Sequence, residues 1–292
     1  MILTLRNHTV PVAVVALAGL VSWYLLAIAL NAHGAIDRTL APRGTWGAWD
    51  LITTTLNLQR PILPAPHQIL LEIWNSVTHY PVTSPRNLLL HTAVTASAAV
   101  TGFVMGVLLG LVLAICIVHS PTLDKALLPW IVASQTVPVL AIAPIVLIIL
   151  GSLGITGLLP KATIAMYLCF FPVTIAAVQG LRGPQRLEME LVYTYAASRI
   201  DTFWMVRLPA ALPFLFPALR VAIASGLVGT MVAELPTGAQ AGLGARLLTG
   251  SYYGNTLQIW AALVMASLLG VALTGLVSLA EFGVMRRYKG RR

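Results

Sequence analysis

The segment Glu190–Pro213 reads ELVYTYAASRIDTFWMVRLPAALP, and it is a long polar interruption in a chain that is otherwise strongly apolar. Of the 292 residues, 58% are hydrophobic and only 9% are charged, whereas a soluble domain carries about 25% charged residues. This composition is typical of a membrane protein. In a chain of this kind, a charged, helix-like segment between two apolar runs is unusual and indicates a function of its own.

Six stretches of the chain are long and apolar enough to cross a bilayer, which takes about 20 residues in a helix. The fold class that this predicts is all-α, a polytopic membrane protein with about six transmembrane helices. The second stretch repeats glycine at Gly102, Gly106 and Gly110, which predicts close helix packing within one subunit. The six stretches are Pro11–Leu30, Leu88–Val118, Leu127–Leu150, Leu159–Gln179, Leu212–Leu235 and Leu257–Phe282.

The Lys and Arg residues indicate the orientation, because cytoplasmic loops of membrane proteins carry an excess of both. With the N-terminus inside, twelve of the 18 fall on the cytoplasmic side and six on the other, which predicts two cytoplasmic termini. The net charge of +9 does not point to nucleic acid as a partner, because no basic stripe with interleaved aromatic residues accompanies it. The six Lys and Arg residues predicted to lie on the outer side are Arg38, Arg43, Arg60, Arg86, Lys161 and Arg246.

On this topology the chain divides into three parts. Residues 1–87 hold the first transmembrane helix and an external loop, residues 88–287 a five-helix core, and residues 288–292 a basic cytoplasmic tail. The first apolar run is long for a signal peptide and no small-residue cleavage site follows it, so we expect a retained span. In the external loop, Gln68–Val77 predicts either an amphipathic helix on the outer membrane interface or a helix packed on the protein surface.

The polar segment that follows the fourth span is predicted to form two short helices on the cytoplasmic side. Ser198 and Asp201 form a capping-box pattern, which predicts a helix over Arg199–Arg207 that ends before Pro209. A second helix is expected over Arg186–Ala196. Two helices joined at an angle can act as a rigid knob that transmits force, and the alternative is a plain interfacial hairpin.

This chain resembles the inner-membrane permease subunits of bacterial binding-protein-dependent ABC importers. Their cytoplasmic signature is Glu-Ala-Ala, three residues, Gly, nine residues and Ile-x-Leu-Pro. Here Glu190-Leu-Val begins the pattern, Ala196 stands at the glycine position, and Val206-Arg-Leu-Pro209 closes it. The branch that handles nitrate, sulfonates, taurine, thiamine precursors, riboflavin or pyrimidines is similar in Val137–Pro144, Ala210–Pro213, Leu219-Arg220 and Val232–Glu234, and the resemblance covers about Leu88 to Arg287.

The resemblance implies one subunit of a larger assembly in the bacterial inner membrane. Its partners are an ATP-binding cassette ATPase dimer, a second permease subunit (identical or homologous) and an external solute-binding protein. The sequence contains no G-x-x-x-x-G-K-[ST] phosphate loop, so ATP hydrolysis falls to a partner chain. We expect a transport subunit and not an enzyme, with no catalytic residue, metal or cofactor of its own.

We call the whole polar segment, residues 181–209, the coupling segment. The resemblance also implies that the ATPases hold its part Glu190–Arg207 in a surface groove. Phe203 and Trp204 are the expected anchors, and Arg199 and Arg207 the expected partners of acids on the ATPase. Glu190 either pairs locally or contacts the ATPase. The full set expected to couple to the ATPase is Glu190, Ala196, Ser198, Arg199, Ile200, Asp201, Phe203, Trp204, Arg207, Leu208 and Pro209.

One position departs from the family pattern in a way that geometry can test. Alanine is less free than glycine at positive φ. The corner at Ala196 is therefore either not left-handed or mildly strained.

Candidates for the transport pathway lie at the ends of two spans. Gln135, Thr136 and Pro138 give the third span a polar, kinked start. Glu234, near the outer end of the fifth span, is either a pathway residue or an acceptor for loop amides around Thr237-Gly238.

The alternative function is a secondary transporter of a small solute, which would need matching inverted halves and carboxylates inside the membrane. The sequence shows neither. Substrate recognition in the resembled family is largely delegated to the external binding protein, so these residues do not name the solute. The arginines outside suit either an anionic solute or lipid headgroups, and Glu234–Gly238 is more similar to members that move vitamin precursors or pyrimidines. Glu281 is expected to pair with the neighbouring Arg286 and Arg287.

Overall fold

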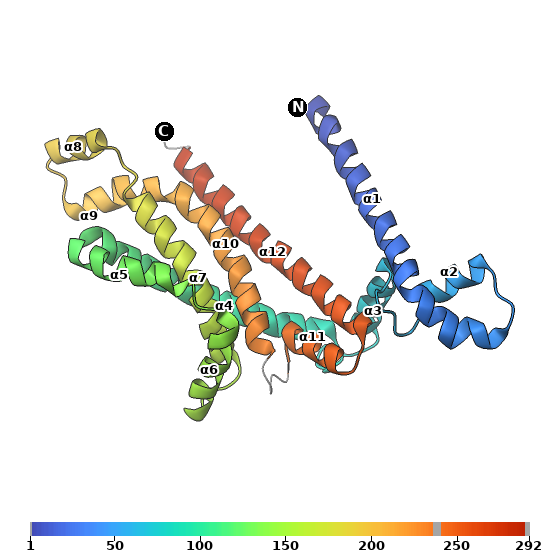
Figure 1. Ribbon diagram of the computed structural model, residues 1–292. Coiled ribbons are helices and arrows are strands. Elements are labelled where there is room, and N and C mark those ends of the chain that lie inside the picture. Colours follow the sequence, from blue (N-terminus) through green and yellow to red (C-terminus); the bar gives the residue numbers. More distant parts are fainter. Residues whose placement is uncertain (1, 236–240, 290–292) are drawn as a thin grey trace. The chain divides into compact units, whose positions relative to one another are not determined.

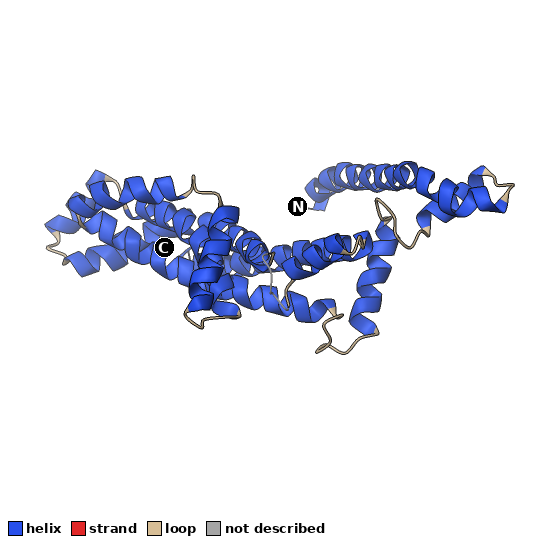
Figure 2. Ribbon diagram, turned by 60° about the horizontal axis from the view of Figure 1, so that its bottom comes forward, coloured by secondary structure: helices blue, strands red, loops and turns tan. Residues whose placement is uncertain are grey.

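The structure is a computed structural model, and it describes residues 2–235 and 241–289. Over these residues the chain consists of helices joined by loops, with no strand (Figure 2). Two compact units are present: Met1–Leu90 with Arg246–Met265, and His91–Ala245 with Ala266–Arg292. The predicted all-α class is confirmed.

In the described residues, five helices are long and apolar enough to cross a membrane, and a bent pair makes a sixth candidate. Each overlaps one of the predicted stretches, which confirms the pattern of about six spans. The five are α1 (Ile2–Ala35), α4 (Leu88–His119), α7 (Leu158–Leu181), α10 (Leu208–Glu234) and α12 (Thr256–Lys289).

The third predicted span is not one straight helix. It consists of α5 (Pro121–Ser134) and α6 (Val139–Ser152), which meet at an angle of 102° (Figure 1). Pro138 precedes α6 with φ −67° and ψ 120°, and a proline also disfavours helical geometry at the residue before it. The prediction of one helix over Leu127–Leu150 is therefore wrong, because residues 135–138, which include the polar Gln135 and Thr136, separate α5 from α6.

In the N-terminal unit, side chains of α1 bind the loop that follows it. After α1 come a π-helical turn η1 (Ile36–Leu40), a 3-10 turn η2 (Ala41–Arg43) and α2 (Ala48–Leu56). Asn31 accepts from the Ile62 amide at 2.7 Å and donates to the Leu63 carbonyl at 2.8 Å. Trp23 donates to the Pro64 carbonyl at 3.0 Å. These bonds satisfy loop backbone groups that lie against an apolar helix.

Helix α3 (Pro66–Thr78) confirms the helix that the sequence predicts in this loop. Ile69 is buried, whereas Leu70, Leu71 and Trp74 form an exposed apolar face on the same helix. Such a face is typical of a helix that lies in a membrane interface. Its placement at the outer interface stays a prediction.

Helix α7 is the centre of the second unit. Its buried Cys169, Val173 and Ala177 form one core with residues of α4 and α10. A Cβ on Gly106 of α4 would come within 2.5 Å of the Cys169 Cβ, so only glycine allows the two backbones to approach this closely. The predicted packing of the glycine row within one subunit is confirmed, because Gly102 and Gly110 meet α7 in the same way.

Candidate functional site

The two short helices predicted for the coupling segment are both present. Helix α8 (Arg186–Thr194) and helix α9 (Arg199–Thr202) lie at one end of the second unit, the end at which α10 begins and α12 ends (Figure 1). None of residues 182–210 is buried. The segment therefore extends away from the core.

The corner between these helices is held in a left-handed conformation. Ala196 has φ 51°, the one positive φ of a non-glycine residue in the described part of the chain. The Ala197 amide donates to the Val192 carbonyl at 3.3 Å, which is the bond that closes a helix end around a left-handed residue. Of the two alternatives for this corner, the strained one is correct.

The predicted capping box starts α9. The Asp201 amide donates to Ser198 Oγ at 3.1 Å, and the Ser198 amide donates to Asp201 Oδ2 at 3.3 Å. Reciprocal bonds of this kind satisfy two amides that a helix start leaves free. The direction in which the chain leaves the corner is thus fixed by both residues.

Beyond α9 the helix does not end before Pro209, and that prediction is wrong. A π-helical segment, η3 (Phe203–Arg207), joins α9 to α10, so that Arg199–Glu234 is one continuous run of 36 residues. Pro209 lies in the first turn of α10. The π-helical turn inserts an extra residue just ahead of it, where a regular helix would need the N–H that proline lacks. The coupling segment is consequently continuous with the fifth span.

Phe203 and Trp204 face different surroundings. Phe203 is partly buried against the core cluster of the second unit, and its ring centroid lies 6.1 Å from that of His119. Trp204 is 61% exposed, and Ile200 and Met205 beside it are exposed as well. The structure therefore places Trp204, and not Phe203, on the surface that a partner could reach.

The charges of the coupling segment are partly used within the chain. Arg186 Nε and Glu190 Oε1 are 2.8 Å apart, one helical turn from each other, which is the local alternative predicted for Glu190. Arg199 and Arg207 form no ion pair within the residues described. Both remain available to acids on a partner.

Two further ion pairs connect elements of the second unit. Arg182, which follows α7, pairs with Asp124 of α5 at 2.8 Å. Arg220 of α10 pairs with Glu281 of α12 at 3.5 Å. The expectation that Glu281 pairs with its own helix neighbours is wrong, because α10 presents a cation across the helix interface.

The break between α5 and α6 exposes polar groups within a membrane-spanning region. Gln135, Thr136 and Pro138 are all exposed, and the Gln135 side-chain amide makes no hydrogen bond within the described residues. Tyr167 of α7 donates its hydroxyl to the Ser134 carbonyl. Non-helical backbone at membrane depth persists only where protein covers it or where it lines a water-filled cavity. An exposed break is what a water-filled pathway or a subunit interface requires, and the assignment of Gln135, Thr136 and Pro138 to the pathway stays a prediction.

Glu234 lies in an enclosed site and is 1% exposed. Its carboxylate accepts from the Gly244 amide at 2.9 Å and from the Thr95 hydroxyl at 3.0 and 2.9 Å. Lys161 Nζ lies 3.4 Å from Glu234 Oε1. Glu234 thus accepts a hydrogen bond from one backbone amide, in the first turn of helix Leu243–Tyr252; the predicted amides around Thr237-Gly238 lie outside the described residues.

Lys161, Thr95 and His91, which accompany Glu234 in this site, are not among the site residues that the sequence predicts. One signal was present, because Lys161 is the single charged residue of the apolar run Leu158–Leu181, and a charge in such a run needs a partner. The threonine and histidine gave no comparable signal. Their proximity to Glu234 depends on how α4 packs.

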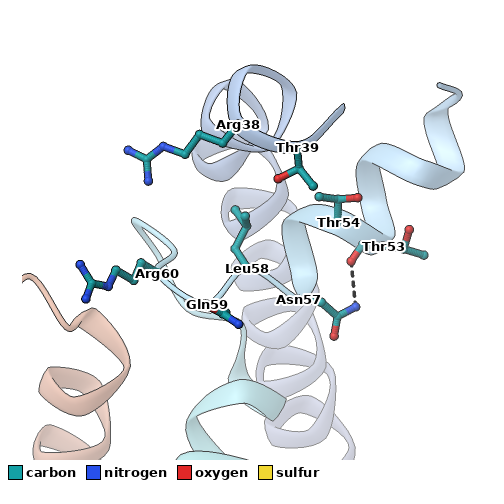
Figure 3. Close-up of a pocket in the computed structure, with 8 residues that line it drawn as sticks. All are labelled: Arg38, Thr39, Thr53, Thr54, Asn57, Leu58, Gln59 and Arg60. Atoms are coloured by element: carbon teal, nitrogen blue, oxygen red, sulfur yellow. Dashed lines mark hydrogen bonds between the residues drawn. The ribbon is translucent and has the colours of Figure 1, made fainter. Parts of the chain in front are cut away.

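A polar pocket of about 620 Å³ lies in the N-terminal unit (Figure 3). The side chains of Arg38 and Arg60 extend toward the same side of it. Neither arginine forms an ion pair in the described part of the chain. Asp37, the neighbour of Arg38, pairs with His33 at 2.7 Å. This geometry fits both alternatives given for the outer arginines, an anionic solute and lipid headgroups. The lining residues are Arg38, Thr39, Thr53, Thr54, Asn57, Leu58, Gln59 and Arg60.

Comparison with known proteins gives consistent results. The family model of the binding-protein-dependent transport system inner membrane component matches residues 106–287. A probable ABC transporter permease protein of Haemophilus influenzae is 30% identical over 77% of this chain and 86% of its own. The riboflavin transport system permease protein RibX of Chloroflexus aurantiacus is 31% identical over 80% and 83%. The formylaminopyrimidine transport permease protein ThiX of Halalkalibacterium halodurans is 28% identical over 82% and 91%.

The matched residues contain the coupling segment, α7, α10, most of α12 and the bent α5–α6 pair. They thus include the exposed two-helix corner and most of the membrane-spanning core of the second unit. The resemblance based on the polar segment and the six spans is confirmed, and the function of a membrane permease for small solutes is shown with it. The chain belongs to the family of binding-protein-dependent transport system inner membrane components, the permease subunits of ABC importers.

Proposed function

We propose that this chain couples to separate ATPase chains through its coupling segment and forms, with a second permease subunit, the pathway of an ATP-driven importer. One observation carries the proposal. Residues 182–209 of the coupling segment include no buried residue, and the segment is continuous with the fifth span through η3.

The surface of the coupling segment is suited to a protein partner. Large apolar side chains on a segment outside the bilayer are covered by neither lipid nor the chain's own core, and such a patch marks an interaction site. Aromatic residues and arginine contribute most of the energy of protein interfaces, and both occur here. The exposed apolar residues are Leu187, Leu191, Tyr193, Tyr195, Ile200, Trp204 and Met205.

The continuous helix suggests how the motion is passed on. When ATP draws two ATPase subunits together, the coupling segments that they hold move with them. Because α9 runs into α10 without a loop, that displacement reaches the fifth span directly. The capping box and the tight corner at Ala196 keep α8 and α9 in a fixed relation while they move.

The solute pathway is proposed to include the break at Gln135–Pro138. Exposed Gln135 and Thr136 offer hydrogen-bonding groups at membrane depth, and such groups are tolerated where water or another subunit meets them. Glu234 lies in an enclosed site, and it is proposed not to line the pathway.

The solute is proposed to be a small molecule of the vitamin-precursor or pyrimidine type, delivered by an external binding protein. Two relatives are named for riboflavin and for formylaminopyrimidine, and others for aliphatic sulfonates and taurine. Uptake assays with each class of solute in reconstituted vesicles would separate these possibilities.

The interface is tested by co-purification with the ATPase. Replacing Ile200 and Trp204 together by Asp buries two charges in the proposed interface, and we expect the ATPase to be lost from the complex. Tyr252→Asp is the matched control, because Tyr252 is 76% exposed and lies outside the coupling segment. Full recovery of ATPase with the double variant would refute the proposed interface.

The orientation is tested separately. In a Cys116→Ser background, a cysteine at Asp201 should react with a membrane-impermeant reagent only when the cytoplasmic side is opened, since the exposed Asp201 is proposed to face the cytoplasm. Reaction from outside intact cells would reverse the topology.

A further inference from the structure

A cluster of buried polar side chains joins three helices of the second unit at the end opposite to the coupling segment. We call His91, Thr95, Lys161 and Glu234 the Glu234 clasp. His91 and Thr95 come from α4, Lys161 from α7 and Glu234 from the last turn of α10. All four residues are less than 9% exposed.

The clasp holds the backbone of four consecutive residues that lead into α11 (Leu243–Tyr252). Lys161 Nζ donates to the Ala241 carbonyl at 2.8 Å, and the Gly242 amide donates to His91 Nδ1 at 2.9 Å. The Leu243 amide donates to Thr95 Oγ1 at 2.8 Å and the Gly244 amide to Glu234 Oε2 at 2.9 Å. We call residues 241–244 the clasped segment. Each of its backbone units is bound by a different side chain of the clasp.

The fit between the clasp and the clasped segment is also steric. A Cβ on Gly242 would lie 2.1 Å from the Glu234 carboxyl carbon, and a Cβ on Gly244 would lie 2.4 Å from the Met231 carbonyl oxygen. Glycine at both positions is what allows the backbone to reach the carboxylate. The Gly244 amide, in the first turn of α11, binds this carboxylate, an arrangement that the helix dipole favours.

Stability alone gives little reason for a charged pair in this place. A buried ion pair loses the hydration of both charges, and well-packed apolar residues of similar volume are often equally stabilising. An apolar pair, however, could not bind the Gly244 amide or the Ala241 carbonyl. The role of the charged groups is thus to hold the clasped segment in one position.

The same helix connects the clasp with the coupling segment. The run from Arg199 to Glu234 contains 36 residues, which corresponds to about 54 Å at 1.5 Å per residue. Trp204, near its start, is exposed to a partner, and Glu234 ends it inside the clasp. Along this run α10 packs on α7, where Gly226 and Gly229 bring the two helices into close contact.

We propose that the Glu234 clasp ties the clasped segment to α10, so that the arrival of a loaded binding protein outside the membrane is passed along α10 to the ATPase. Glu234, Lys161 and Thr95 are positioning residues in this scheme. The inference rests on the proposed function and its orientation, because it needs the clasp on the outer side and the ATPase on the coupling segment. Stimulation of the ATPase by the binding protein is the property that depends on the clasp.

The test uses the complete importer, reconstituted in lipid vesicles with its ATPase and binding protein. The variants are Glu234→Gln with Lys161→Met, which removes both charges together, and Thr95→Val, which removes one hydroxyl at nearly constant volume. For both we expect ATPase co-purification and basal ATP hydrolysis as in the wild type. Stimulation by the loaded binding protein should fall about tenfold in the double variant and about threefold in Thr95→Val.

A matched control separates positioning from general loosening. Arg220→Met with Glu281→Gln removes another ion pair that α10 makes with a neighbouring helix, but this pair does not bind the clasped segment. The control should keep its stimulation. If it loses as much as the clasp variants, or if Thr95→Val and the double variant both keep full stimulation, the inference is overturned.

Thr95→Val also guards against loss of the fold. If the double variant does not assemble, Thr95→Val alone decides between the two outcomes. Failure of the wild-type permease to bind an ATPase at all would instead refute the proposed function, so the two failures are distinguishable.

Discussion

Replacing Trp204 by alanine should weaken binding of the ATPase far more than it affects the permease itself. A Trp side chain has roughly 200 Å² of surface, so an exposed fraction of 61% leaves about 120 Å² for a partner to cover. At about 25 cal/mol per Å², full coverage is worth about 3 kcal/mol. Since each 1.4 kcal/mol is about a tenfold change in affinity, Kd should rise by about 100-fold.

The neighbouring Phe203 provides the contrast. Phe203 packs against the core beside His119, and truncation of a core phenylalanine costs about 3–5 kcal/mol of stability when the side chain is fully buried. Phe203→Ala should therefore lower the thermal midpoint of the permease while Kd for the ATPase changes by less than about threefold. The two variants separate the residue that contacts the partner from the residue that anchors the coupling segment.

The assay is a titration of purified ATPase against permease in lipid nanodiscs, with the thermal midpoint of each variant measured in parallel. Tyr252→Ala is the control for loss of an exposed aromatic residue outside the coupling segment. An unchanged Kd for Trp204→Ala would refute the reasoning, because it would mean that no partner covers this surface. A large loss of affinity for Phe203→Ala, with none for Trp204→Ala, would reverse the assignment.

Ala196→Gly should slow proteolysis of the coupling segment or leave it unchanged, because the relief of strain at φ 51°, about 1–2 kcal/mol, is partly offset by a more flexible unfolded chain. Gly106→Ala should destabilise the permease by about 1–3 kcal/mol, which would appear as a lower thermal midpoint. The control is Gly275→Ala on α12, where a Cβ meets nothing within 4 Å, and it should not lower the midpoint. A cysteine at Gln135 should react with a hydrophilic thiol reagent if the break lines water, whereas one at the exposed apolar position Ile148 should not; equal reactivity would contradict the pathway assignment.

The features that the sequence predicted well are those decided by neighbouring residues. A transmembrane helix needs only a long apolar run, so α4 and α7 begin and end within a few residues of the predicted limits. The start of α9 also depends on local chemistry, because Ser198 and Asp201 are three residues apart in any helix that they cap. Neither prediction required knowledge of the surrounding fold.

Two of the predictions that failed concern proline. Pro138 lies within the predicted third span and Pro209 just before the predicted fifth span, and the sequence predicts a kink at Pro138 and a helix end before Pro209. The structure shows a sharp break at Pro138 and a continuous helix at Pro209. Proline removes one N–H in both places, but whether the helix breaks or widens into a π-helical turn depends on the neighbouring helices. Phe203, which belongs to η3, packs against the core cluster, and this contact favours the continuous helix.

The pairing of Lys161 with Glu234 shows why the candidate site was only partly predictable. The two residues are 73 positions apart, and nothing in the apolar runs between them encodes their distance. The sequence placed both near the outer ends of spans, where a charge can reach water and needs no partner. Their burial becomes necessary only when the glycines of α4 and α10 draw these helices onto α7, because close packing removes the water that would otherwise solvate the charges. The two charges then lie next to each other, and the clasped segment takes the remaining hydrogen-bonding groups. Small residues along the helices thus determine where the polar residues at their ends meet.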